Sequence, residues 1–494
     1  MRRHLGIGVL AMLATLMGCE SQVGVAAVYG GDPAATLPAG PDDDTPPGPP
    51  AGPLTLSDFA IQPSPRNVVS CYVTLTTSEP ARVAVEVGKD AAYTFRVRDD
   101  TLAVAHKVIV FGLHADTAWH LRAVATAPDG RTVASEDRTF TTGPLPPEVP
   151  VAKLSVPNTG SAQPGFTLTG VGFGLPWDAS SSVAVMYDLQ GEVVWYYVHP
   201  DGPASIATLV DGGKHVLVAA GTHPLQIDLA GQVVWESPVE PSVENTTWSS
   251  WTPNTFHHEF TQLPNGNYAV IRFRLSDHEL SDALEEMAPD GTVLWSWSTA
   301  AEIEGWGYGT GLVIDLQNDA AYYSSRLLSK ILKIDRKTGT GLWYRGSGGS
   351  FATDPSAEVP WFADQHDPVL LPSGNLLMFD NGPEERGWSR VVEYALDEKA
   401  MTAKVVWQYP KPEAGGIPAE AWYTIGGGSG QRLPNGNTLI AAITGLFGDQ
   451  EGSCRIFEVD PAGDVVWRIA ADRDDAVTYR AERVMPAGYE LIAP

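Results

Sequence analysis

Short runs that alternate hydrophobic and polar residues fill most of the chain and are separated by turn residues, a pattern that predicts an all-β protein. One phrase recurs between residues 190 and 470, as GEVVW, GQVVW, GTVLW, GTGLW, AKVVW and GDVVW. The phrases end in tryptophans spaced 40, 60, 48, 64 and 60 residues apart: Trp195, Trp235, Trp295, Trp343, Trp407 and Trp467. A four-stranded blade with variable loops has this length, so we predict a six-bladed β-propeller over residues 151–494.

The turns and the end of the chain fit a propeller. Asn265-Gly266, Ser373-Gly374 and Asn435-Gly436 separate apolar runs, and glycine permits the positive φ angles that tight hairpin turns require. We expect the repeated tryptophans to fill the space between neighbouring blades. The final segment, VTYRAERVMPAGYELIAP, is expected to supply a strand that closes the ring and removes exposed strand edges.

Residues 54–145 alternate in the same way, in runs such as CYVTLTT, ARVAVEV and WHLRAVATA, and predict a small β-sandwich of about seven strands ahead of the propeller. The stretch GLHADTAWHLRAVATAPDG, followed by RTFTTG, resembles a fibronectin type III module. Three histidines in this region lack the spacing of metal ligands, and we interpret them as surface or core-edge residues: His106, His114 and His120.

The N-terminus predicts export. Residues 1–18 carry two arginines and then an apolar stretch too short to cross a bilayer, which is typical of a signal peptide. The segment Leu16-Met17-Gly18-Cys19 resembles the bacterial lipobox, in which the cysteine is lipidated. We therefore expect a cell-envelope lipoprotein held to the membrane through Cys19, on the periplasmic or extracellular face, and Glu20 favours the outer membrane. The alternative is an ordinary secretory signal that happens to end near a cysteine.

Composition and net charge indicate how the chain is organised and which classes of partner are disfavoured. Residues 19–53 are rich in Pro, Gly and Asp and are expected to form a disordered tether. The formal charge is −27 and becomes about −29 without Arg2 and Arg3 of the signal, which argues against nucleic acid and anionic membrane surfaces as partners. Besides Cys19 there are only Cys71 and Cys454, in different predicted domains, so apolar burial rather than a disulfide should stabilise the fold.

Two blades carry a histidine at the same position. His258 lies six residues before Pro264, and His366 lies six residues before Pro372. The innermost strands of a propeller line its central channel, so residues just before these strands converge at one mouth of the channel. The two imidazoles are therefore expected to share a site. The alternative is that they only hydrate a water-filled channel.

Several segments together carry a family resemblance: FHHEF, YYSSRLLSKILKIDRKTGTGLWY, QHDPVLLPSGNLLMFDNG, SRVVEYALDE and QRLPNGNTLI. They resemble the bacterial arylsulfate sulfotransferase family over residues 165–494. The resemblance implies a six-bladed propeller of the cell envelope that moves a sulfuryl group from a phenolic sulfate ester to a phenol acceptor. It also implies that no nucleotide sulfate donor is used and that a histidine carries the group transiently.

The resemblance assigns roles to single residues. His366 matches the family's nucleophile, and a neutral imidazole is a competent nucleophile near neutral pH. His258, or else His257, matches a second family histidine. Arg326 matches the family's arginine, whose planar cation suits the sulfuryl oxygens as charge spreads over them. The alternative for Arg326 is an ion pair with an acidic neighbour on the fourth blade.

The chain departs from the family at one place. A His-x-Asn pair usually precedes the inner strand of the fourth blade, and here Tyr308 and Thr310 stand at those two positions, where we expect Tyr308 to act in catalysis and Thr310 to bind the substrate. A phenol, with a pKa near 10, is a weaker general acid or base than histidine at neutral pH. The departure predicts either an altered acid–base arrangement, or a changed substrate or lost activity.

Aromatic residues precede several of the inner strands, and a collar of rings there would suit a flat phenolic substrate. The residues of this predicted collar are Trp248, Trp251, Phe256, Trp306, Tyr308, Trp361, Phe362, Trp422 and Tyr423. The alternative is that they pack the top of the propeller. We predict no cofactor and no metal site, because His257-His258-Glu259 and Asp380 do not form a loop with ligand spacing. The rival function is a non-catalytic lipoprotein propeller that binds glycan or protein.

Overall fold

The computed structural model describes residues 52–492 with short gaps. The residues outside the description are 1–51, 158–159, 174–181, 200–203, 221–223, 239–255, 277–278, 302, 304–306, 354–357, 413–416, 419–420, 444–453, 474 and 493–494. The predicted signal peptide, Cys19 and nearly all of the predicted tether therefore lie outside the described residues. No helix in the described part of the chain has the length and apolar character needed to cross a bilayer.

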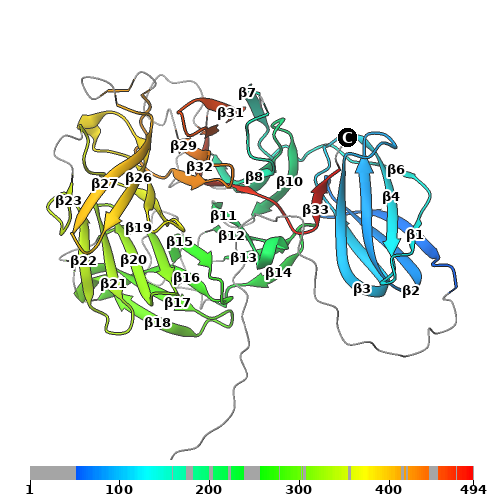
Figure 1. The fold of residues 1–494 in the computed structure, drawn as a ribbon, viewed down its shortest axis with the longest axis horizontal. Helices are drawn as coiled ribbons and strands as arrows, with labels where there is room; N and C mark the ends of the chain where they lie inside the picture. Colours follow the sequence, from blue (N-terminus) through cyan, green and yellow to red (C-terminus); the bar gives the residue numbers. More distant parts are fainter. Residues whose placement is uncertain are drawn as a thin grey trace, which may run out of the picture. The chain divides into compact units, whose positions relative to one another are not determined.

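Six sheets of mainly antiparallel strands form the propeller (Figure 1), as predicted. Blades 2 to 4 each contain four consecutive strands. These are β11 (Ala204–Val210), β12 (His215–Ala220), β13 (Leu225–Asp228) and β14 (Val233–Glu236); β15 (Phe256–Gln262), β16 (Tyr268–Ser276), β17 (Glu279–Met287) and β18 (Val293–Ser298); β19 (Gly309–Asp315), β20 (Ala320–Ser325), β21 (Lys330–Asp335) and β22 (Gly341–Gly346). Within each blade the chain runs from the innermost strand outward.

Blades 5 and 6 each gain a fifth strand at the outer edge. Blade 5 consists of β24 (His366–Leu370), β25 (Leu376–Asp380), β26 (Arg390–Asp397) and β27 (Thr402–Tyr409), with the short β23 (Ala352–Thr353) parallel to β27. Blade 6 consists of β28 (Ser429–Arg432), β29 (Thr438–Ile443), β30 (Cys454–Val459) and β31 (Val465–Ala471), with β7 (Ala152–Val156) beside β31.

Blade 1 joins the two ends of the propeller. Its innermost strand is the C-terminal β32 (Ala476–Val484), which pairs with β8 (Phe166–Phe173), followed by β9 (Ser182–Tyr187) and β10 (Val193–His199). The innermost strands contact one another around the ring in the order β11, β15, β19, β24, β28 and β32, and β32 returns to β11. The prediction that the tail closes the ring is confirmed, and closure leaves no open sheet edge between the first and last blades.

The repeated tryptophans pack each blade against the next. Trp235 stacks on Tyr268 of the following blade, with ring centroids 4.8 Å apart, and its indole N–H donates to the carbonyl of Pro289 at 3.0 Å. Trp467 of blade 6 is fully buried and donates to the carbonyl of Leu189 in blade 1 at 2.9 Å. These contacts support the predicted packing role, because the rings fill space between blades and the N–H groups of Trp235, Trp295 and Trp467 donate to carbonyls of the next blade.

The predicted hairpin turns are also present. Gly266, Gly374 and Gly436 have φ angles of 84°, 82° and 89° and lie between the first and second strands of blades 3, 5 and 6. An L-residue with a side chain is disfavoured at such angles, so glycine determines where each hairpin turns. The turns place the innermost strands of these three blades in equivalent registers, which aligns His258 with His366.

The N-terminal domain is a seven-stranded β-structure whose seventh strand comes from the other end of the chain. Its own strands are β1 (Leu56–Pro63), β2 (Cys71–Gly88), β3 (Phe95–Val110), β4 (Ala118–Thr126), β5 (Thr132–Ala134) and β6 (Arg138–Thr141). The last strand, β33 (Tyr489–Leu491), pairs with β3. The predicted boundaries, 54–145 and 151–494, do not include this exchange.

Aromatic packing and charge hold the exchanged strand. The ring of Tyr489 stacks on Phe95 at 5.0 Å and meets Phe166 of blade 1 edge-on at 4.8 Å. Glu490 forms ion pairs with Arg96, at 2.6 Å, and with Arg98. The closing strand β32 is thereby fixed at its C-terminal end to the N-terminal domain.

The cysteines and the N-terminal histidines have no role in a metal or disulfide site among the described residues. Cys71 and Cys454 are buried, unpaired thiols, and burial raises the pKa of each to about 12. Each of the three histidines is paired with one aspartate, His106 with Asp99, His114 with Asp188 and His120 with Asp137.

Candidate active site

Three of the predicted site residues converge where the innermost strands of blades 3, 4 and 5 begin. The ring of His258 lies 6.4 Å from that of His366 and 4.8 Å from that of Tyr308, measured between centroids. Arg326 completes the group, because its guanidinium lies 5.7 Å from the centre of the Tyr308 ring. The structure therefore brings together the four residues predicted to be catalytic.

Irregular backbone at the strand starts directs these side chains. Register shifts interrupt the pairing at the beginning of β15, β19 and β24. His258, Tyr308 and Asp367 have φ angles of 57°, 51° and 50°, in the left-handed region that non-glycine residues rarely adopt. Bulges of this kind kink a strand and change where its side chains point, and they are frequent beside functional sites.

Hydrogen bonds fix the tautomer of His366. Its Nδ1 lies 2.8 Å from Oδ1 of Asn381 and 3.1 Å from the carbonyl oxygen of Asp364. The Asn381 amide is oriented by Nδ2, which donates to the carbonyls of Thr424 and Gly427 at 2.9 and 3.0 Å. Because Nδ1 faces two acceptors, it carries the ring hydrogen. The lone pair of the neutral ring is consequently on Nε2.

Burial keeps both histidines uncharged. Burial lowers the pKa of His366 to about 3, and Arg326 and Arg480 add to this effect, whereas the hydrogen bond that His366 donates to Asn381 opposes it. Burial also lowers the pKa of His258 well below its usual value, with contributions from His257, His366, Arg480 and Arg326. At neutral pH the site thus presents a neutral imidazole with a fixed lone pair, next to cations.

Arg326 is held by backbone carbonyls. Its Nη2 donates to the carbonyl of Ile425 at 3.0 Å, and its backbone N–H donates to the carbonyl of Tyr308 at 3.0 Å. Its buried Nε has no hydrogen-bond partner, and it forms no ion pair with a carboxylate, within the described residues. The predicted alternative of an ion pair on blade 4 is therefore not observed there, and the guanidinium keeps donors for an anion.

Tyr308, which the family resemblance placed at a histidine position, has a buried phenol beside Arg326. Burial raises its pKa, Asp282 adds to the rise, and Arg326 opposes it. The phenol therefore keeps its proton near neutral pH and can donate a hydrogen bond there. The hydroxyl of Thr310 is fully buried and donates to the carbonyl of Gln365 at 2.7 Å. Thr310, predicted to bind substrate, thus uses its hydroxyl to tie the start of β19 to the residue before His366.

Two members of the predicted aromatic collar are part of the blade packing. The ring of Trp422 is 8% exposed and lies 5.4 Å from that of Phe379 and 6.2 Å from that of Phe457. Trp361 stacks on Tyr394 at 6.2 Å. These contacts favour the packing alternative for both tryptophans. Other members of the collar, Trp248, Trp251 and Trp306, lie outside the described residues.

The closing strand adds two residues to the site that were not predicted from the sequence. The ring of Tyr479 lies 5.7 Å from that of His258 and 5.9 Å from that of His366. Arg480 donates from Nη2 to the carbonyl of His258 at 3.0 Å and lies 3.0 Å from carboxylate oxygens of both Glu259 and Asp367. The guanidinium therefore connects the strands that bear the two histidines.

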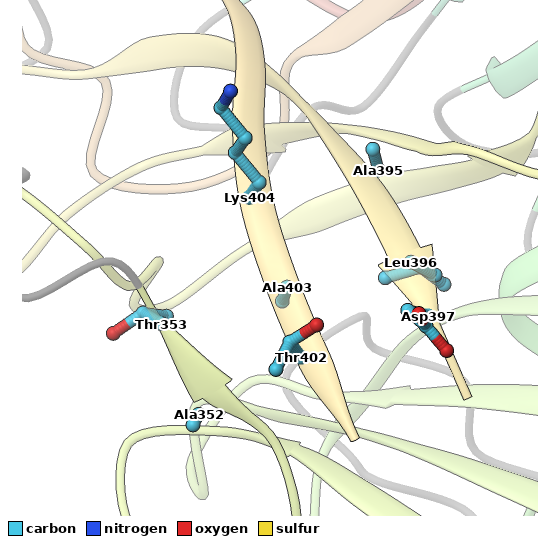
Figure 2. Close-up of a pocket in the computed structure, with 8 residues that line it drawn as sticks. All are labelled: Ala352, Thr353, Ala395, Leu396, Asp397, Thr402, Ala403 and Lys404. Atoms are coloured by element: carbon cyan, nitrogen blue, oxygen red, sulfur yellow. The ribbon is translucent and has the colours of Figure 1, made fainter. Parts of the chain in front are cut away.

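A pocket of about 410 Å³ lies elsewhere, at the outer edge of blade 5 (Figure 2). It is lined by β23, the end of β26 and the start of β27, through Ala352, Thr353, Ala395, Leu396, Asp397, Thr402, Ala403 and Lys404. These residues belong to the outer strands, whereas His366 begins the innermost strand of the same blade. The pocket is therefore separate from the histidine cluster.

A comparison with known protein families gives a match over most of the propeller. A family model described as Arylsulfotransferase (ASST) matches residues 155–305 and 304–480. No significant match is found among curated protein sequences.

Solved structures show distant similarity. A protein of unknown function from Bacteroides caccae is 17% identical, with a TM-score of 0.43, and the match covers 64% of this chain and 100% of that one. A protein of unknown function from Bacteroides thetaiotaomicron VPI-5482 is 12% identical, with a TM-score of 0.32 and coverage of 86% and 99%. A luciferin-regenerating enzyme is 14% identical, with a TM-score of 0.36 and coverage of 64% and 95%. Similarity this distant carries no argument about function.

Proposed function

Because the chain belongs to the arylsulfotransferase family, whose model spans about two thirds of it, we propose that it transfers a sulfuryl group from a phenolic sulfate ester to a phenol through a sulfohistidine at His366. The observation that carries the proposal is the fixed tautomer of His366. Asn381 and the Asp364 carbonyl hold the hydrogen on Nδ1, so that the lone pair of Nε2 is available to attack sulfur.

In the first half of the reaction, Nε2 of His366 attacks the sulfur of the donor, an N–S bond forms and the S–O bond to the phenol breaks. In the second half, the oxygen of an acceptor phenol attacks the same sulfur and the N–S bond breaks. Arg326, whose guanidinium lies 5.7 Å from the centre of the Tyr308 ring, would meet the growing charge on the sulfuryl oxygens, and its Nε, which has no partner among the described residues, would supply a donor. His258 is the side chain placed to exchange a proton with the phenol oxygens.

The proposed cellular location rests on the N-terminal sequence. The signal segment and Cys19 predict a lipid anchor in the cell envelope, with Glu20 favouring the outer membrane. Phenolic sulfates and phenols that reach this compartment are the substrates that the proposal requires.

The proposal is tested with the purified protein, 4-nitrophenyl sulfate as donor and phenol as acceptor. We expect release of 4-nitrophenol, formation of phenyl sulfate and, without acceptor, a protein mass increased by one sulfuryl group. Peptide mapping should place that group on His366. If the protein neither releases 4-nitrophenol nor gains the sulfuryl mass, the transferase proposal is wrong and the binding alternative is favoured.

The pH dependence gives a second test. The burst of 4-nitrophenol that reports attack by His366 should keep the same rate constant from about pH 5 to pH 8, because the ring stays neutral when its pKa is about 3. A histidine with an ordinary pKa near 6.5 would instead lose activity as the pH falls through that value. Rapid-mixing measurements across this range decide the point. An acid limb centred near 6.5 in the burst would show that His366 is not held neutral.

A further inference from the structure

Three side chains, those of His258, His257 and Asp282, lie in a row that leads away from the reacting centre. Nδ1 of His258 lies 2.9 Å from Nδ1 of His257, a distance that requires a hydrogen between the two rings. Nε2 of His257 lies 3.3 Å from Oδ1 of Asp282, within ion-pair distance although not aligned as a hydrogen bond. Asp282 is fully buried on β17, the third strand of the same blade.

The far end of this row is rigid. Oδ2 of Asp282 accepts hydrogen bonds from the hydroxyl of Tyr323 at 2.6 Å and from the backbone N–H of Gly309 at 2.7 Å. The ring of His257 is stacked on Phe273, with centroids 3.7 Å apart and planes inclined by 11°. The carboxylate is thus oriented by two donors and the ring plane is held by Phe273, so that His257 connects Asp282 to His258.

The charged groups that surround His258 differ from those that surround His257. Burial lowers the pKa of the His258 ring, and His257, Arg480 and Arg326 lower it further. The carboxylate of Asp282 approaches the His257 side. Tyr308, Tyr479 and His366 also face His258 and are neutral near pH 7, because burial raises the pKa of each phenol and lowers the pKa of His366. The cations therefore lie beside His258, and the carboxylate of Asp282 lies beside His257.

We propose that Asp282 and His257 form a proton relay with His258, in which His257 stores the proton that His258 exchanges with the phenol oxygens. The proposal rests on the transferase function proposed above and names how its acid–base step works. His257 acts through His258 and Asp282 acts through His257, so both are positioning residues rather than groups that touch the substrate. The relay explains how the site functions although Tyr308 replaces the family histidine.

The proton balance of the relay is complete. Before the first step, His257 is an imidazolium with hydrogens on both nitrogens, and neutral His258 carries its hydrogen on Nε2. When the S–O bond breaks, Nε2 of His258 gives that hydrogen to the departing phenolate oxygen, and Nδ1 of His257 gives its hydrogen to Nδ1 of His258. In the second half, the acceptor phenol returns a proton to Nε2 of His258 and the transfers run in reverse. His258 stays neutral in both states.

The relay is tested by donors that differ in their need for a proton. Phenyl sulfate releases a basic phenolate that requires protonation, whereas 4-nitrophenyl sulfate releases a stable one. For Asp282→Asn and His257→Phe, we expect phenol release from phenyl sulfate in a single turnover to fall on the order of 10²-fold. Release from 4-nitrophenyl sulfate should fall by less than about fivefold, because little proton transfer is needed. The phenylalanine keeps the stacking on Phe273.

Glu285→Gln is the matched control. Glu285 is buried on the same strand as Asp282 but is paired with Arg272 and Arg274. The Glu285→Gln variant should leave the ratio of the rates with phenyl sulfate and 4-nitrophenyl sulfate unchanged. Equal losses for both donors in the Asp282 and His257 variants would overturn the relay and indicate a purely structural role. Unchanged rates for both donors would overturn it as well. A wild-type protein that is inactive with both donors would instead contradict the transferase proposal.

A readout independent of activity separates these cases. Nitrogen NMR of the substrate-free protein should show His257 protonated on both nitrogens and His258 protonated on Nε2. In Asp282→Asn the amide donates to Nε2 of His257, so the doubly protonated signal of His257 should disappear. Two neutral rings in the wild-type protein at pH 7 would overturn the proposal whatever the substrates.

Discussion

Replacing His366 with alanine should abolish sulfuryl transfer, lowering kcat by about 10⁴-fold or more, because removing a nucleophile leaves only binding and electrostatic effects. The variant should also fail to gain the sulfuryl mass when incubated with 4-nitrophenyl sulfate and no acceptor. The side chain is 2% exposed. A folding control is therefore needed, and circular dichroism together with the midpoint of thermal unfolding supplies it.

His215→Ala provides the matched comparison for this result. His215 begins the second strand of blade 2 and is paired with Asp211 at 2.7 Å. Its loss should leave transfer within about twofold of wild type, since surface ion pairs contribute little to the fold. A folded His366→Ala protein that still transfers the sulfuryl group at the wild-type rate would refute the nucleophile assignment. A variant that is inactive but still gains the sulfuryl mass would move the covalent site to another residue.

The scaffold could be predicted because its signals are local and repeated. Each tryptophan phrase marks one blade, and each Gly-containing turn fixes the register of a first hairpin. This register alone aligned His258 with His366. The exchange of β33 into the N-terminal domain has no such signal. It depends on contacts such as that between Glu490 and Arg96, which are far apart in the sequence.

The chemistry around the histidines was only partly predictable. Asn381 lies in the FDNG segment that carried the family resemblance, but its effect on the tautomer of His366 depends on two carbonyls from a later loop. Arg480 lies on a closing strand whose blade is split between the two ends of the propeller, so no neighbouring repeat reveals its alignment. Asp282 lies on the third strand of its blade, and an acidic residue there is ordinarily expected to be exposed to solvent.

For the aromatic collar, the sequence suggested substrate-binding residues that the structure places in the packing between blades. A tryptophan shortly before an inner strand has the same sequence signature whether it faces a ligand or packs between blades. The structure resolves the ambiguity for Trp422, whose ring lies between Phe379 and Phe457. Only contacts between different blades distinguish the two cases, and a single sequence does not contain them.

Replacing Arg326 with methionine should lower kcat/KM for transfer by about 10² to 10³-fold, because a preorganised cation that meets developing charge contributes this much when it is lost. Arg326→Lys should recover part of the loss. Lysine keeps the charge, but it cannot both donate to the carbonyl of Ile425 and present the planar edge with Nε to the sulfuryl oxygens. The measurements are kcat and KM with 4-nitrophenyl sulfate and phenol for each variant.

The distribution of the loss between kcat and KM tests the role of the guanidinium. If Arg326 stabilises the transition state, most of the effect falls on kcat, whereas a residue that only binds the anionic donor would mainly raise KM. Arg336→Met is the control on the same blade, since Arg336 pairs with Glu286 and Asp319 instead of the histidine cluster. It should keep kcat/KM near wild type. A loss confined to KM in Arg326→Met would contradict the proposed transition-state role, because the sulfuryl oxygens gain charge only as the group is transferred.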